Sequence, residues 1–184
     1  MSLVTLAPKD WVVVSNGLEN KTVEEGKDEF EEGLKDVDAS LGDGYDDGFS
    51  VQYYNDTPKI APYLYAFIAG PYDSIETNEK IPGRAEPLRM RLYFRKTLRN
   101  DVIRVQDLMF EPIVQGIHWY SEFFNYNYPY EKYDQIFCPE FKFGAMENVG
   151  TVTFTENLLF RGKKISENET NYLINVALHK LSYH

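Results

Sequence analysis

Apolar and polar side chains alternate along several stretches of this 184-residue chain, as they do in β-strands. In residues 88–95 the alternation is regular, which predicts a strand with one buried face. Residues 151–155 alternate in the same way, with threonines on the second face. Three more stretches have the apolar content of strands: 11–16, 49–54 and 63–70. The last is a continuous apolar run, so we expect both of its faces to be covered.

From Asp101 onward the apolar period changes to that of a helix, three to four residues. Pro112 is expected to break or start a helix, so the pattern predicts two helical pieces. A last helix is predicted to begin near Ser166, because Ser166 and Glu169 have the spacing of a capping box. Its apolar face consists of Leu173, Val176, Ala177 and Leu181.

Negative charge is concentrated in one part of the chain. The formal net charge is −10, and residues 17–48 hold twelve Asp or Glu against three Lys. Five glycines interrupt this stretch, which favours a solvated loop or insertion between the strands 11–16 and 49–54; a docking surface for a basic partner is the alternative. The charge balance argues against binding to nucleic acid or to an anionic membrane surface.

The remaining composition narrows the class of protein. No apolar run approaches the ~20 residues of a membrane-spanning helix. The first residues lack the basic start and apolar core of a signal peptide. Cys138 is the single cysteine, which excludes an internal disulfide framework and fits a reducing compartment. We therefore expect an intracellular protein without a membrane span.

The stretch Gly144-Ala145-Met146-Glu147-Asn148 lies between two short apolar runs and carries the candidate chemistry. Gly144 and Ala145 leave the backbone bare, so another extended chain could pair with it. Glu147 offers a carboxylate beside that backbone, where it could hold an ammonium group. A plain loop with one acidic residue is the alternative interpretation.

This motif resembles the G-A-M-E-N motif of the zinc aminopeptidases related to alanyl and leucyl aminopeptidases and to leukotriene hydrolase. The surroundings are similar as well, including Tyr128-Pro129-Tyr130 before the motif and Thr153-Phe154-Thr155-Glu156 after it. The resemblance implies an α+β fold. Residues 1–56 would be the end of an N-terminal β-domain with an acidic insertion at 17–48, and residues 57–184 would be the first half of a thermolysin-like catalytic domain.

The resemblance also implies a role for the motif. Gly144 and Ala145 would pair with a peptide as an added strand, and Glu147 would contact the free α-amino group at the peptide's N-terminus. Met146 and Asn148 complete the predicted substrate-binding motif.

In the resembled family the last helix carries H-E-x-x-H, whose histidines bind zinc and whose glutamate is the general base. Here His179 matches the first ligand, Lys180 stands at the position of the base, and Tyr183 stands at that of the second ligand. Protonated lysine cannot accept a proton, and neutral tyrosine is a poor zinc ligand. His184 lies about 140° around a helix from His179 and cannot replace it. We therefore predict that zinc, the family's cofactor, is not bound by this chain.

These departures predict a catalytically inactive, aminopeptidase-like protein that serves as a structural or accessory subunit. Other protein chains are expected to cover the apolar face of the helix 166–184, because the elements that pack there in the resembled domain lie further along that domain. The alternative is a piece of an active zinc-dependent aminopeptidase that releases N-terminal residues from peptides.

Overall fold

The computed structural model describes residues 2–37, 48–161 and 164–184. It is a mixed α/β structure, and it divides into two compact units, Met1–Tyr72 and Asp73–His184. The described residues include no helix that is both long and apolar enough to span a membrane.

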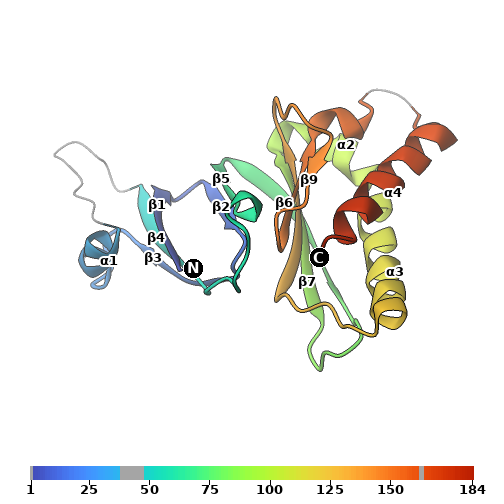
Figure 1. Cartoon of the computed structure of the whole chain (residues 1–184). Coiled ribbons are helices and arrows are strands. Elements are labelled where there is room, and N and C mark those ends of the chain that lie inside the picture. The colour runs from blue at the N-terminus through green and yellow to red at the C-terminus, as the bar shows by residue number, and fades with distance from the viewer. Residues whose placement is uncertain (1, 38–47, 162–163) are drawn as a thin grey trace. The chain divides into compact units, whose positions relative to one another are not determined.

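The N-terminal unit contains two small sheets (Figure 1). The first has the strand order β1 (Leu3–Pro8), β4 (Phe49–Tyr54), β3 (Glu19–Glu24). In the second, β2 (Val12–Ser15) pairs antiparallel with β5 (Phe67–Gly70). The predicted strands 11–16 and 49–54 are thus both present, but they do not pair with each other as a hairpin.

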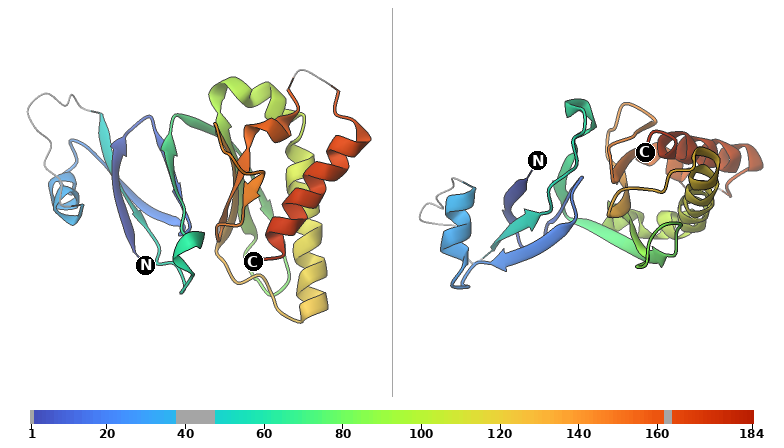
Figure 2. Two further views of the ribbon diagram at one scale, coloured as in Figure 1. Left: turned by 45° about the horizontal axis from the view of Figure 1, so that its top comes forward. Right: turned by 60° about the horizontal axis from the view of Figure 1, so that its bottom comes forward.

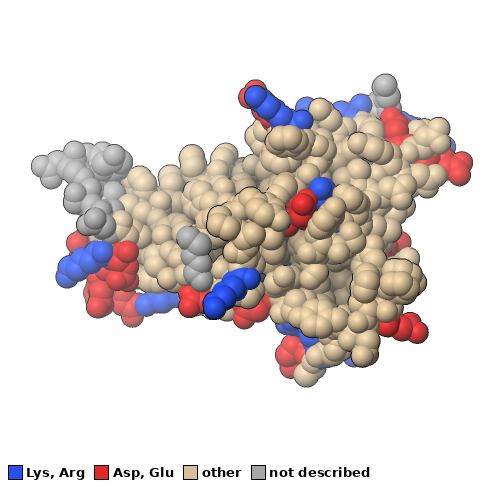
Figure 3. Space-filling view, viewed as in Figure 1, with Lys and Arg blue, Asp and Glu red and all other residues tan. Residues whose placement is uncertain are grey.

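The acidic stretch is more ordered than a solvated loop. It contributes strand β3 and a short helix, α1 (Phe30–Asp36), so the expectation of a solvated loop is wrong for the described residues, and that of an insertion stays a prediction. The reason is local amphipathicity: Phe30 and Leu34 are buried on one side of α1, while the acidic side chains face solvent. Residues 38–47 of the stretch lie outside the described part of the chain. In the space-filling view, acidic and basic atoms gather around α1 and β3 (Figure 3).

The predicted strand 63–70 is shorter and less buried than expected. A 3-10 turn, η1, occupies Pro62–Leu64, and only Phe67–Gly70 is strand. Strand β5 has one partner, β2, so it lies at the edge of a two-stranded sheet. As a result Phe67 is 54% exposed, and the expectation that both faces are covered is wrong.

The C-terminal unit is a five-stranded sheet with helices on one face (Figures 1 and 2). The strands run in the order β6 (Tyr72–Glu79), β7 (Leu88–Arg95), β8 (Lys132–Cys138), β10 (Thr151–Thr155), β9 (Ala145–Met146). β7, β8 and β10 are parallel, and β9 pairs antiparallel with β10 at the edge. The predicted strands 88–95 and 151–155 are confirmed. All five residues of β10 are buried, so the expectation of a single buried face is wrong for this strand.

The helical region is divided, but not where the proline is. Helix α2 (Arg99–Ile103) follows the 3-10 turn η2 (Lys96–Leu98), and α3 (Gln106–Phe124) contains Pro112 in its interior. The prediction of two helical segments is confirmed. The prediction that a helix breaks or starts at Pro112 is wrong. The buried stripe of α3 holds the helix on the sheet, and the Gln135 amide donates to the Met109 carbonyl at 3.0 Å near the proline. Tertiary packing thus outweighs the local cost of the proline.

Helix α4 (Glu167–Leu181) begins at the predicted capping box and packs along α3. The turn η3 (Glu156–Leu159) precedes it. Leu173 and Ala177 are 0% exposed and Leu181 is 3% exposed, within this chain alone. The expectation that the apolar face of the helix 166–184 lies open for another chain is therefore wrong for these three residues, whereas Val176, the fourth residue of that face, is only partly buried. The cause is α3, which supplies the cover: Gly116 lets the helices approach closely, since a Cβ there would lie 2.7 Å from Leu181 Cδ2.

Replacing Leu173 by alanine is expected to destabilise the chain by about 2–5 kcal/mol, because the leucine side chain is fully buried in the core. Urea unfolding of the two proteins measures the difference. Tyr172→Ala is the matched control on the neighbouring, exposed position and should change the free energy of unfolding by less than about 1 kcal/mol. Equal, small effects of both changes would mean that α4 does not pack in this way.

Candidate functional site

Strand β9 presents an unpaired backbone edge. Its register pairs Ala145 with Phe154 and Met146 with Thr153, and the Thr155 N–H donates to the Gly144 carbonyl at 3.0 Å. In an antiparallel ladder the residues that bond to the partner alternate along the strand. The backbone N–H and C=O of Ala145 therefore point away from β10, toward the open side of the sheet.

A tight turn joins β9 to β10 and fixes the motif. The Thr151 N–H donates to the Asn148 carbonyl at 3.0 Å, and the Thr153 hydroxyl donates to the Asn148 side chain at 3.2 Å. Gly150 has a φ of +67°, a conformation that favours glycine. Asn148 is thus a structural residue of the turn, which its place in the predicted substrate-binding motif did not indicate.

A groove runs between the β9 edge and helix α4, and we call it the β9–α4 groove. It has a volume of about 660 Å³. Its lining residues are Phe143, Gly144, Ala145, Tyr172, Asn175, Val176, His179 and Lys180. The structure thus brings the start of the predicted motif together with the predicted zinc helix. Tyr172 and Asn175 were not predicted as site residues, although they lie seven and four residues before His179, a spacing that places all three along one side of a helix.

Glu147 is paired with a cation from α4. The Lys180 ammonium donates to Glu147 Oε2 at 2.7 Å, and the two side chains are only 15% and 16% exposed. Burial opposes ionisation of Glu147, but the hydrogen bond and charge of Lys180 outweigh it, so the pKa of the carboxyl lies below its usual value. This contact was not predicted, because it joins residues 33 positions apart in the chain.

The donors on α4 do not fit a zinc ion. The ring of His179 contacts that of Tyr183 edge to face, with centroids 5.2 Å apart. A catalytic zinc site takes three protein ligands of the Cys, His, Asp or Glu type. Here one imidazole stands beside a phenol and the ammonium of Lys180. In the three described segments, no cluster of three such side chains is placed to hold a metal.

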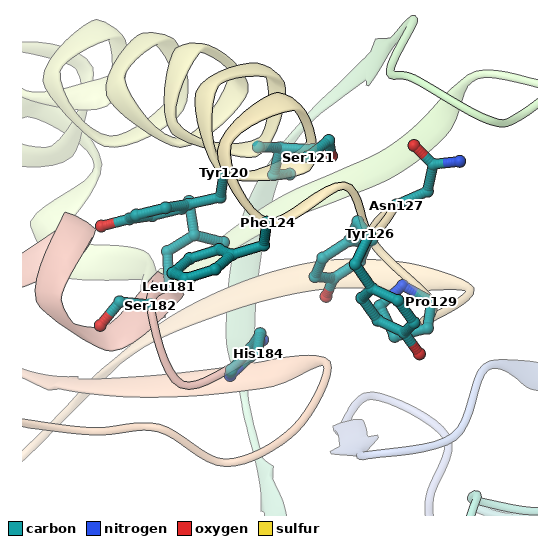
Figure 4. A pocket seen from close by; sticks show the side chains of 11 residues that line it. Tyr120, Ser121, Phe124, Tyr126, Asn127, Pro129, Leu181, Ser182 and His184 are labelled. Carbon is teal, nitrogen blue, oxygen red and sulfur yellow. The ribbon is translucent and has the colours of Figure 1, made fainter.

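His184 occupies a separate, aromatic cavity of about 270 Å³ (Figure 4). Its ring lies against Tyr128, Tyr130 and Tyr133, with centroid distances of 6.2, 5.8 and 5.4 Å. His179 lines the β9–α4 groove instead, so the two histidines face different cavities. Burial lowers the pKa of the His184 imidazole to about 4, although the backbone and charge of Glu147 favour the protonated form.

An edge strand beside a groove is an arrangement with which proteins bind extended peptides by adding a strand to a sheet. Together with the helix that carries His179, it fits the metallopeptidase class that the motif at 144–148 resembles.

Comparison with known proteins agrees with this class. Residues 109–184 match the model of the Peptidase family M1 domain. The chain is 36% identical over 157 residues to aminopeptidase N of Streptomyces lividans, an alignment that covers 85% of this chain and 15% of that protein. It is 29% identical to rat aminopeptidase N over 75% of this chain, and 32% identical to a puromycin-sensitive aminopeptidase of Caenorhabditis elegans over 69% of it.

The chain therefore belongs to the zinc aminopeptidases of peptidase family M1. It spans 13–15% of the length of these three relatives.

The His184 pKa predicts how stability depends on pH. Because the folded pKa is about 4 and the ordinary pKa of histidine is 6.5, the unfolded chain binds more protons between these two values. The His184 contribution to the free energy of unfolding should thus fall as the pH drops from 6.5 toward 4. An NMR titration of the His184 ring protons should give a midpoint near 4. In urea unfolding, the free energy of the His184→Leu variant should lack the part of the pH dependence that comes from His184. A ring midpoint near 6.5 would contradict the buried position.

Proposed function

We propose that this chain is a catalytically inactive member of the zinc aminopeptidase family that keeps a peptide-docking edge and acts as an accessory subunit. The observation that carries the proposal is the Lys180–Glu147 ion pair. By resemblance, Lys180 stands at the position of the family's general base, and Glu147 stands at that of its amine-binding carboxylate.

Two chemical deficits support inactivity. An ammonium held 2.7 Å from a carboxylate has no lone pair with which to take a proton from water. Its positive charge would also oppose a dication bound at the neighbouring His179. With Tyr183 as the second candidate donor, the helix offers one good zinc ligand where a catalytic site needs three.

In the finer fold assignment that we propose, residues 1–56 are the end of the family's N-terminal β-domain. Residues 57–184 would then be the first half of a thermolysin-like catalytic domain. The helix-covered sheet of the C-terminal unit supports this division, whereas β5 lies after the proposed boundary and pairs with β2 before it. The compact units themselves meet at Tyr72 and Asp73, 16 residues after the proposed boundary.

The peptide-docking part of the proposal rests on β9. The Ala145 backbone points away from β10, and the adjacent groove has apolar walls that can receive the side chains of an extended peptide.

The accessory role needs a surface for a partner chain. Because the inner face of α4 is already covered, the exposed aromatic side chains at the end of α3 are the better surface: Trp119, Phe123 and Phe124. Large exposed aromatic groups of this kind mark protein–protein contacts.

A second candidate function is that of the active family members: zinc-dependent release of N-terminal residues from peptides. The identity of 36% over most of this chain favours it. The residues at positions 180 and 183 count against it, since a lysine and a tyrosine there remove the base and a metal ligand.

The purified chain is expected not to hydrolyse amino-acid anilides, with or without added zinc, because the base and the ligand set are missing. Chromogenic anilides of alanine and leucine measure this directly. Turnover that a chelator abolishes and zinc restores, in a homogeneous sample, would overturn the proposal and favour the second candidate.

The double variant Lys180→Glu, Tyr183→His is the informative comparison in the same assay. It restores a carboxylate and an i, i+4 histidine pair, so its affinity for zinc should rise. It should still lack turnover, because a third protein ligand is missing among the described residues. Activity of this variant would show that other parts supply the rest of the site.

A further inference from the structure

We propose that Lys180 takes the place of an incoming ammonium group at Glu147, so that the β9–α4 groove accepts extended peptide segments without selecting for a free N-terminus. This inference rests on the proposed function of β9 as a docking strand. It concerns the class of ligand: internal or N-blocked segments of a polypeptide are bound as well as free N-termini.

The geometry of the ion pair is that of a filled ammonium site. The Lys180 Nζ to Glu147 Oε2 distance of 2.7 Å is typical of a charge-assisted hydrogen bond. Both side chains are about five-sixths buried, so solvent screens the pair only weakly. The Lys180 Nζ also lies 5.9 Å from the centroid of the Tyr183 ring, a second favourable contact for the cation.

The position of the pair determines what a ligand in the groove meets. Lys180 is one of the residues that line the groove, whereas Glu147 is not. A peptide paired with the β9 edge thus encounters the lysine side chain before the carboxylate. Its own ammonium could reach Glu147 only by displacing another ammonium, which would then lose its partner. The exchange leaves no net gain in ion pairing.

The rest of the groove favours backbone and apolar recognition. Ala145 offers a backbone donor and acceptor at the open edge, and the side chains of Phe143, Tyr172 and Val176 are apolar or aromatic. Asn175 adds an amide that can bond to a peptide group. None of these groups is an anion, so none forms an ion pair with a free N-terminal ammonium that an acetylated peptide would lack. The groove is therefore expected to recognise the backbone and the apolar side chains of an extended peptide.

The test compares two peptides of identical sequence, Leu-Ala-Val-Ala amide with a free N-terminus and the same peptide acetylated. At pH 6.5 the free α-amino group is protonated, since its pKa is about 7.7–8.0. Dissociation constants are measured by NMR from the shift of the Ala145 amide, which reports binding at the β9 edge itself. The proteins compared are the wild type, Lys180→Met, and the control Lys164→Met, which removes the same charge from an exposed position before α4.

The wild type and Lys164→Met should bind the two peptides with affinities equal within about twofold. Lys180→Met exposes the carboxylate and should prefer the free peptide by about tenfold, the effect expected for one charge-assisted contact. A tenfold preference already present in the wild type would overturn the inference and leave the docking proposal intact. If neither peptide shifts Ala145 in any protein, the docking proposal itself fails, and the inference fails with it.

Glu147→Gln serves as a second variant if Lys180→Met does not fold, because it keeps the shape and a hydrogen-bond acceptor. If Glu147 contacts the ammonium group of the peptide, this change should weaken binding of the free peptide about tenfold and leave binding of the acetylated peptide unaffected. That result would overturn the inference. We expect Glu147→Gln to bind the free and the acetylated peptide with dissociation constants that agree within about twofold.

Discussion

The close packing of α4 on α3 fixes the position of the candidate residues on that helix. Gly116 makes it possible, because a Cβ there would lie within 2.7 Å of Leu181 and 2.8 Å of Leu178. With Leu173, Ala177 and Leu181 buried in the core of the C-terminal unit, α4 cannot rotate without exposing them. The side of the helix that carries His179 and Lys180 therefore lies along the β9 edge. The ion pair to Glu147 follows from that placement.

This packing separates two properties that active members of the family combine. The edge strand, its turn and the groove are built by backbone register and by Asn148 and Gly150, none of which depends on a metal. By resemblance, the chemistry would depend on positions 180 and 183, where this chain has a lysine and a tyrosine. In the function that we propose, the chain keeps the docking of an extended peptide without hydrolysing it.

The sequence was sufficient for elements whose pattern is local. The strand 88–95 and the capping box at Ser166 were predicted correctly, because alternation and cap spacing are encoded within a few residues. The break predicted at Pro112 is wrong, since the buried stripe of α3 outweighs the cost of a proline in a helix. The covered face of α4 was also missed, because its cover is α3, and no local pattern shows which helices pack together.

The candidate site was predicted in its parts but not in its central contact. The motif at 144–148 and the altered helix were both singled out, whereas the bond between Glu147 and Lys180 spans 33 positions and depends on the fold. The pKa of the Glu147 carboxyl, measured by NMR in the wild type and in Lys180→Met, tests this contact most directly. Our account predicts a wild-type pKa below 4.5 that rises in the variant. The same pKa in both proteins would contradict it.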